Sequence, residues 1–189
     1  MTAKFGIDLK KAREHPSSKL LDFEFWSDER CVFVAELKTI TRYPPSEETG
    51  WDITHHSHVE LSAVRTENSP NRVANLIGKA FTQLELRPEP KWVILLNDAD
   101  LNLLDLKEAV QGYLDYQSLA GTVVTNTSSA HVAQRLKKTL AHLDALLWIE
   151  RSTSQYSYFC ISEEGLGIYQ RYFAKKSPAE VHFSWGVSP

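Results

Sequence analysis

The chain has 189 residues, of which 42% are hydrophobic and 24% are charged, and this is sufficient for one hydrophobic core. Its 21 Lys and Arg residues against 24 Asp and Glu residues give a formal net charge of −3. This charge excludes a histone-like polycation that binds nucleic acid through its whole surface. No apolar run reaches the about 20 residues that span a bilayer, and residues 1–6 carry no secretory signal pattern. We therefore expect a cytoplasmic protein without a membrane partner.

The first third of the chain is dominated by a β-hairpin pattern. A short helix is predicted over residues 7–15, where His15-Pro16 ends it. Runs of aromatic and β-branched residues, Leu20–Trp26 and Cys31–Ile40, then flank the polar segment Ser27–Arg30 and predict two antiparallel strands. Residues 41–60, with two prolines and three histidines, predict a long loop, and a further strand is expected over Val59–Val64.

The rest of the chain alternates helical and strand patterns. Ser69-Pro70 is a typical helix start, and an apolar stripe of period 3.6 predicts a helix to Leu84. Trp92–Leu96 is a continuous apolar run typical of a strand buried on both faces. The remaining predicted elements are a helix over Leu103–Leu119, a buried strand over Gly121–Thr125, a helix over Ala130–Ile149 and a hairpin of Gln155–Ile161 with Leu166–Phe173. This order predicts one α/β domain over residues 1–173 and a C-terminal tail over 174–189.

Charged residues interrupt the hairpin on one face. Glu36 and Lys38 are two residues apart on a strand, so they emerge on the same side, about 7 Å apart. Burying either charge in this apolar strand is costly unless it meets the other, a metal or a substrate. Asp22 and Glu24 share one face of the partner strand, so the hairpin is expected to gather two or three carboxylates and one amine.

The pairing register of the two strands decides whether this cluster forms. Asp22 faces the same way as Glu36 only if paired residue numbers sum to an even value, for example Asp22 opposite Glu36. We therefore predict an odd-length loop between the strands, or a bulge with the same effect. Such a cluster suits hydrolysis of a phosphodiester, because carboxylates hold Mg²⁺ and a nearby amine stabilises a charged phosphate.

The segment Asp22–Phe25, a turn and the segment Val32–Lys38 together resemble the signature of the restriction-endonuclease-like superfamily, also called PD-(D/E)xK nucleases. The next helix and the strand Trp92–Leu96 are similar to the αβββαβ core of that family, a mixed central sheet flanked by helices, here with a C-terminal helix and hairpin added. The resemblance covers about residues 7–96, half of the chain. Because the segment between the predicted first helix and Asp22 is very short, the family's first strand is expected to be absent or displaced to Val59–Val64.

The resemblance implies cleavage of DNA by an endonuclease that depends on Mg²⁺ or Mn²⁺. By this similarity Asp22, Glu36 and the Leu37 backbone carbonyl would hold the metal, and Lys38 would be the catalytic base or a charge stabiliser. The supporting residues expected around them are Glu14, Glu24, Lys79 and Gln83. The candidate nucleic-acid contacts are Arg72, Arg135 and Lys138. Whether the active unit is a homodimer is left open.

Other interpretations of these residues remain open at this point. Asp22, Glu36 and Lys38 also fit a cross-strand ion pair on a half-exposed sheet. The basic stripe His131, Arg135, Lys138 and His142 also fits the solvated face of an amphipathic helix. His55, His56 and His58 have the spacing of transition-metal ligands but also suit a polar loop. The alternative function is a catalytically inactive module of the same fold that binds nucleic acid or a protein partner.

Overall fold

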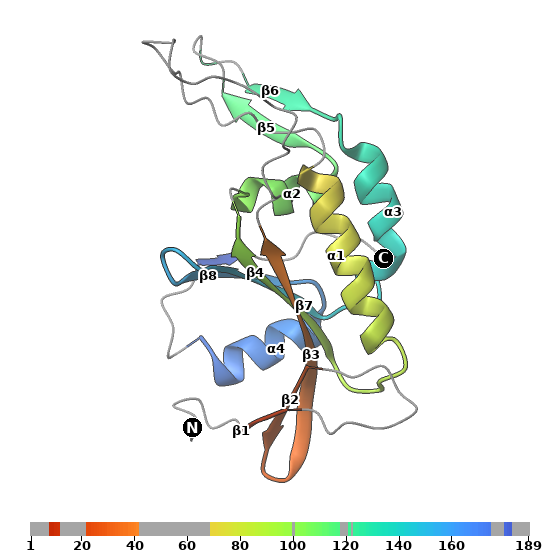
Figure 1. The fold of residues 1–189 in the computed structure, drawn as a ribbon, viewed down its shortest axis with the longest axis vertical. Coiled ribbons are helices and arrows are strands. Elements are labelled where there is room, and N and C mark those ends of the chain that lie inside the picture. The colour runs from red at the N-terminus through yellow and green to blue at the C-terminus, as the bar shows by residue number, and fades with distance from the viewer. Residues whose placement is uncertain are drawn as a thin grey trace, which may run out of the picture.

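A mixed seven-stranded β-sheet organises the molecule (Figure 1). The computed structural model describes residues 8–11, 22–41, 69–99, 101–117, 121, 123–174 and 180–182. Its strands are β1 (Asp8–Lys11), β2 (Phe23–Ser27), β3 (Arg30–Thr41), β4 (Lys91–Asp98), β5 (Leu114–Gln117), β6 (Val123–Asn126), β7 (Ala145–Glu150), β8 (Gln155–Cys160) and β9 (Glu180–His182). Its helices are α1 (Ser69–Leu84), α2 (Leu103–Gln111), α3 (Ala130–Leu140) and α4 (Glu163–Tyr172). The prediction of an α/β fold is confirmed at this level.

The strand order in the large sheet is β1-β2-β3-β4-β7-β8-β9. β1, β2 and β3 form an antiparallel meander, whereas β3, β4 and β7 run parallel. Parallel neighbours need crossover connections, and crossovers that proceed in the same direction put their helices on the same face. In Figure 1, α1 and α3 accordingly lie together on one side of the sheet and α4 lies on the other. β5 and β6 form a separate two-stranded ribbon beyond α2.

Each face of the sheet has its own hydrophobic core. The core beneath α1, α2 and α3 is largely aliphatic and includes Val34, Ile40 and Ile77. The core on the α4 face is largely aromatic, with Phe33 stacked on Trp92 at 4.3 Å between ring centroids. Successive residues of β3 alternate between these cores, which places Glu36 on the face of α1.

The β2–β3 hairpin has the predicted register. Its turn contains only Asp28 and Glu29, which both have positive φ, at 49° and 65°. Because this turn has an even number of residues, the numbers of the paired residues next to it sum to an odd value. A bulge between Phe25 and Trp26 changes the register, so that from Phe25 opposite Phe33 to Phe23 opposite Ala35 the paired residue numbers sum to an even value. The bulge alternative of the register prediction is therefore confirmed, and Asp22 is directed to the Glu36 face.

The N-terminal prediction was wrong at residues 8–11. These residues form β1, an edge strand paired antiparallel with β2, from Asp8 opposite Trp26 to Lys11 opposite Phe23. The pairing provided by the β2 edge outweighs the weak helical pattern of such a short segment. The first strand of the meander is thus neither absent nor displaced. The predicted loop over 41–60 and strand over Val59–Val64 lie outside the described residues, apart from Thr41 at the end of β3.

Two C-terminal predictions were also wrong. The helix predicted over Ala130–Ile149 ends at Leu140, and the apolar run Ala145–Glu150 becomes the buried strand β7, because a short apolar run fits a strand as well as a helix. The residues expected to form the second strand of a hairpin, Leu166–Phe173, lie mostly in α4. The Ser162 side chain caps α4 by accepting from the Gly165 amide at 3.0 Å, and two glutamates occupy the first turn.

Smaller differences concern the middle and the end of the chain. The helix predicted over Leu103–Leu119 stops at Gly112, whose φ of 81° ends α2, and β5 follows. The strand over 123–126 exists but is exposed rather than buried. Within the expected tail, β9 joins the sheet beside β8. In the part of the chain that the structure describes, no helix is long and apolar enough to cross a membrane.

Candidate functional site

The candidate site lies where β3 runs past the end of β2. Asp22 directly precedes β2, Glu36 and Lys38 lie on β3, and Gln83 reaches them from the last turn of α1. The structure therefore brings together four predicted residues from three elements. Their common position follows from the hairpin register, which fixes Asp22 against Glu36, and from the crossover, which lays α1 over this face.

Two reciprocal hydrogen bonds join Asp22 to β3. The Asp22 amide donates to Glu36 Oε2 at 3.2 Å, and the Leu37 amide donates to Asp22 Oδ2 at 2.8 Å. Each carboxylate is thus held by a main-chain N–H of the neighbouring segment. These bonds fix both carboxylates in position before any ligand binds.

Lys38 is held between two side chains. Its Nζ lies 2.5 Å from Glu36 Oε1 and 2.5 Å from Gln83 Oε1. The amine therefore bridges β3 to α1, and it retains some exposure, with 21% of the side chain accessible. It lies at the boundary between the buried carboxylate and solvent.

Glu36 is only 1% exposed. Burial raises the pKa of Glu36 above the usual value for a glutamate, and the charge of Asp22 acts in the same direction. The hydrogen bond and the charge of Lys38 act in the opposite direction but do not cancel the effect of burial. A buried carboxylate that lacks full compensation is a group whose ionised form gains from an additional cation.

The donor atoms at the site are oxygens. Because the N–H and C=O of a strand residue point to the same edge, the Leu37 carbonyl lies on the edge where its amide meets Asp22. Two carboxylates and one carbonyl form a set that suits a hard cation such as Mg²⁺ or Mn²⁺ rather than Zn²⁺. Among the described residues, no group of three or more His, Cys, Asp and Glu side chains is arranged to hold a metal. Such a cation would thus depend on the carbonyl, on water and on substrate for its other ligands.

The other supporting residues lie apart from this centre or outside the description. Glu24 accepts from Arg87 at 2.9 Å and from the Trp26 indole at 3.1 Å, so its carboxylate is engaged in a separate ion pair. Glu14 lies outside the described residues, as do the three histidines at 55, 56 and 58. Lys79 lies on α1, one turn before Gln83, in the lining of a pocket.

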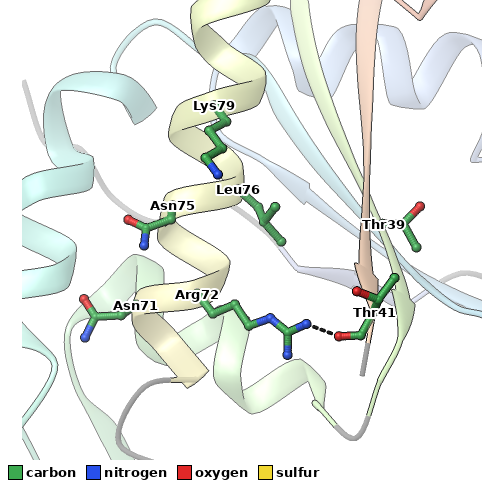
Figure 2. Close-up of a pocket in the computed structure, with 7 residues that line it drawn as sticks. All are labelled: Thr39, Thr41, Asn71, Arg72, Asn75, Leu76 and Lys79. Atoms are coloured by element: carbon green, nitrogen blue, oxygen red, sulfur yellow. Dashed lines mark hydrogen bonds between the residues drawn. The ribbon is translucent and has the colours of Figure 1, made fainter. Parts of the chain in front are cut away.

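This pocket has a volume of about 380 Å³ and lies between α1 and the C-terminal part of β3 (Figure 2). Arg72 reaches across it and donates a hydrogen bond to the Thr41 carbonyl. Its lining is formed by Thr39, Thr41, Asn71, Arg72, Asn75, Leu76 and Lys79. Arg72 and Lys79 were expected near the site, but the two threonines and two asparagines were not. These residues come together only because α1 packs beside the edge of β3, and no local pattern in the sequence predicts that packing.

The two remaining candidate contacts lie on α3. Arg135 donates to the Asn71 side chain at 3.2 Å, which links α3 to the start of α1, and Lys138 is exposed. α1 carries two Lys or Arg residues and α3 carries three, and neither helix contains Asp or Glu. This side of the molecule is therefore basic although the chain has a net negative charge.

Comparisons with known proteins add no relative. No protein-family model, no curated protein and no solved structure matches this chain. The function is therefore inferred from the residues and their geometry.

Proposed function

We propose that this protein is a Mg²⁺-dependent phosphodiesterase that cleaves DNA as an endonuclease. The single observation that carries the proposal is the convergence of Asp22, Glu36 and Lys38, with Gln83, at one point beside β3. A cross-strand ion pair on an exposed sheet does not require a buried carboxylate, an aspartate fixed by a main-chain amide and a glutamine from a helix. A site for a cation and a phosphate uses all of them.

The order of elements around the site supports the same proposal. β1, β2 and β3 form a meander, α1 follows, and β4 returns parallel to β3. This order is similar to the strand–strand–strand–helix–strand part of the core expected from the resemblance to restriction-endonuclease-like nucleases. Because fold alone does not determine function, the order is secondary to the geometry of the site.

The chain's own residues suggest a division of roles. Asp22, Glu36 and the Leu37 carbonyl would hold the divalent cation, which supplies charge neutralisation and lowers the pKa of a bound water. In the reaction a water oxygen bonds to phosphorus, one P–O ester bond breaks, and the departing oxygen takes up a proton. Since the Lys38 amine is ion-paired with Glu36, we assign it to stabilising the negative charge of the phosphate rather than to proton abstraction. Gln83 positions that amine.

DNA is the proposed substrate because of the charge on the side of the molecule beside the site. The absence of carboxylates from α1 and α3 leaves their five Lys and Arg side chains uncompensated within those helices. Such a basic surface attracts the phosphate backbone of a nucleic acid. Arg72, Arg135 and Lys138 are the proposed backbone contacts.

The test is cleavage of plasmid, single-stranded and branched DNA in Mg²⁺ by the wild type, Asp22→Asn, Glu36→Gln and Lys38→Met. Each substitution keeps the approximate size of the side chain and removes its charge. We expect each variant to lose at least about a hundredfold in cleavage rate, because a charge lost at the reacting phosphate costs several kcal/mol. Matched variants Glu164→Gln and Lys107→Met make the same chemical changes on α4 and α2, outside the site and the basic helices, and should retain the wild-type rate.

The folded state of each variant is checked by circular dichroism and thermal unfolding, because an unpaired buried charge also destabilises the protein. Cleavage that survives in folded Glu36→Gln and Lys38→Met protein would refute the assigned roles. Cleavage that is unchanged by removal of divalent ions would refute the requirement for a metal.

The inactive nuclease-fold module remains a second candidate because of one observation. Glu36 and Lys38 already form an ion pair, which is also compatible with a purely structural role of the cluster. Titration with Mg²⁺ by calorimetry separates the two functions. Binding at millimolar concentration that is lost in Asp22→Asn supports the enzyme, and no heat of binding supports the module.

A further inference from the structure

The pocket between α1 and β3 begins directly beside the candidate site. On α1, Gln83, Lys79 and Arg72 are separated by four and seven residues, so they lie along one stripe of the helix. At 1.5 Å per residue, Lys79 lies about 6 Å and Arg72 about 16 Å from Gln83 along the helix axis. On β3, Thr39 and Thr41 follow Lys38 along the strand. The pocket therefore begins one helical turn from Gln83 and one residue from Lys38.

The lining of the pocket has the chemistry of an anion site. Its α1 wall presents one guanidinium, one ammonium and two carboxamides, Thr39 and Thr41 form the β3 wall, and the lining contains no carboxylate. Arg72 is oriented by the Thr41 carbonyl, which holds the guanidinium across the mouth of the pocket (Figure 2). Carboxamides and cations together are typical of sites that bind phosphate oxygens.

The position of the pocket indicates which phosphate it accepts. The range of about 6 to 16 Å from Gln83 corresponds to the next one to three phosphates of the strand, because a full sugar–phosphate unit separates successive phosphates and this spacing exceeds the axial rise of about 3.4 Å per nucleotide. A strand whose scissile phosphate lies at Lys38 would therefore carry another phosphate into the pocket. The volume of about 380 Å³ leaves room for the phosphate and part of its sugar.

We propose that the Arg72–Lys79 pocket binds one backbone phosphate of the cleaved DNA strand, one to three nucleotides to one side of the scissile bond. This inference rests on the proposed nuclease function. It adds an asymmetry to that function, because a contact on one side of the bond fixes the direction in which the strand crosses the site. A strand that ends at the scissile phosphate on the pocket side would bind more weakly than one that extends into the pocket.

The test uses single-stranded oligonucleotides in which one phosphate at a time is replaced by an uncharged methylphosphonate. Binding is measured by fluorescence anisotropy in Ca²⁺, and a denaturing gel verifies that the strand stays intact. For the wild type we expect one position, one to three nucleotides from the cleavage point mapped in Mg²⁺, at which neutralisation weakens binding about tenfold, the effect of one charged hydrogen-bonded contact. In Arg72→Ala/Lys79→Ala the same replacement should have no further effect.

A control variant separates this contact from general electrostatic attraction. Arg171→Ala/Lys107→Ala removes the same charges from α4 and α2, outside the pocket. In this variant, neutralising the one sensitive phosphate should still weaken binding as it does in the wild type. In the pocket variant, the slope of log affinity against log salt should also fall by about 0.7, the contribution of one phosphate contact on a single strand.

The outcomes distinguish the two proposals. If the DNA is cleaved in Mg²⁺ but binding is equally sensitive to neutralisation at every phosphate, the pocket inference is overturned and the nuclease proposal stays intact. A position-specific loss of binding that persists in Arg72→Ala/Lys79→Ala has the same consequence. If wild-type protein neither binds nor cleaves any strand, both proposals are overturned. If the protein binds a strand without cleaving it, the phosphate positions are counted from the end of the bound segment instead of the cleavage point. The pocket inference is again overturned if no single phosphate stands out when it is neutralised.

Discussion

Glu36 shows how single residues define this site. A carboxylate at 1% exposure is stable only with partners, and here it has the Asp22 amide and the Lys38 amine. Removing either partner leaves a buried charge without compensation, which costs about 3–5 kcal/mol in typical buried pairs. The residues that would act on a substrate are therefore also those that stabilise this corner of the fold. For this reason isosteric, neutral replacements are preferred to alanine when the roles are tested.

A second ion-pair cluster, beyond the end of α1, allows a prediction of stability. Arg87 donates two hydrogen bonds to Glu89 and one to Glu24, each at 2.9 Å. The hydrogen bond from Arg87 lowers the pKa of Glu89 below its usual value. Glu89→Gln should reduce the free energy of unfolding by about 1 kcal/mol at pH 7, because the pair is only partly buried. Urea denaturation of both proteins measures this difference.

The stability difference between the wild type and Glu89→Gln depends on pH in a way that follows from the lowered pKa of Glu89. Because the folded pKa of Glu89 is below the unfolded value of about 4.5, the stabilisation is complete above pH 4.5 and is lost as the pH falls through the lower folded pKa. The wild type and Glu89→Gln should therefore converge in stability in acid. Glu85→Gln, at an exposed position nearby, should differ from the wild type by less than about 0.5 kcal/mol at either pH. If the difference in free energy of unfolding between the wild type and Glu89→Gln widened in acid, the stabilising role of the Arg87–Glu89 ion pair would be contradicted.

At the scale of elements, the β2–β3 hairpin is the part on which the site depends most. Its two-residue turn requires positive φ at both Asp28 and Glu29. Aspartate tolerates this conformation through local hydrogen bonding, whereas glutamate has no such compensation. The turn is therefore strained at Glu29 although it belongs to the element that positions Asp22.

Glu29→Gly should relieve this strain. We expect the free energy of unfolding to rise by about 0.5–1 kcal/mol, because glycine adopts positive φ without a steric penalty and suits this type of hairpin turn. Chemical denaturation is the measurement, and Glu29→Ala is the control, since alanine removes the charge but keeps the Cβ atom. Equal stabilisation by alanine and glycine would show that charge rather than backbone conformation is responsible.

The elements also show which parts of the structure the sequence predicts. α1 was predicted from Ser69 to Leu84 and is observed over that range, because its cap and its apolar stripe are local signals. β1 and β7 were predicted as helical because short segments are decided by the strand edges available to them, which are tertiary features. The site cluster was predictable because period-2 alternation and register parity suffice to bring Asp22 to Glu36. The Arg72–Lys79 pocket was not, because its two walls are far apart in sequence.

At the scale of the whole molecule, the sheet changes from antiparallel to parallel pairing at β3. The carboxyl ends of β3, β4 and β7 consequently lie at the same edge of the sheet, where parallel strands commonly bind ligands. α1 and α3 cover the adjacent face and carry only basic charges. Site and basic surface therefore lie on the same side of the molecule.

This segregation of charge predicts binding to a polyanion by a protein of net charge −3. At pH 7.5 and low salt, the wild type should be retained on heparin and should elute at lower salt after Arg135→Ala/Lys138→Ala. Arg30→Ala/Arg171→Ala removes the same charge from exposed positions on β3 and α4 and should elute close to the wild type. Equal shifts in the two double variants would mean that net charge, and not its location, controls binding.

The bulge between Phe25 and Trp26 has a consequence for how this chain can vary in length. One additional residue in the turn would place Asp22 among the aromatic rings near α4, unless the bulge disappeared at the same time. Two additional residues would leave the aspartate on its present side. Functional variants of this sequence should thus tolerate the insertion of an even number of residues in the β2–β3 turn. They should tolerate an odd number only if the bulge is lost at the same time.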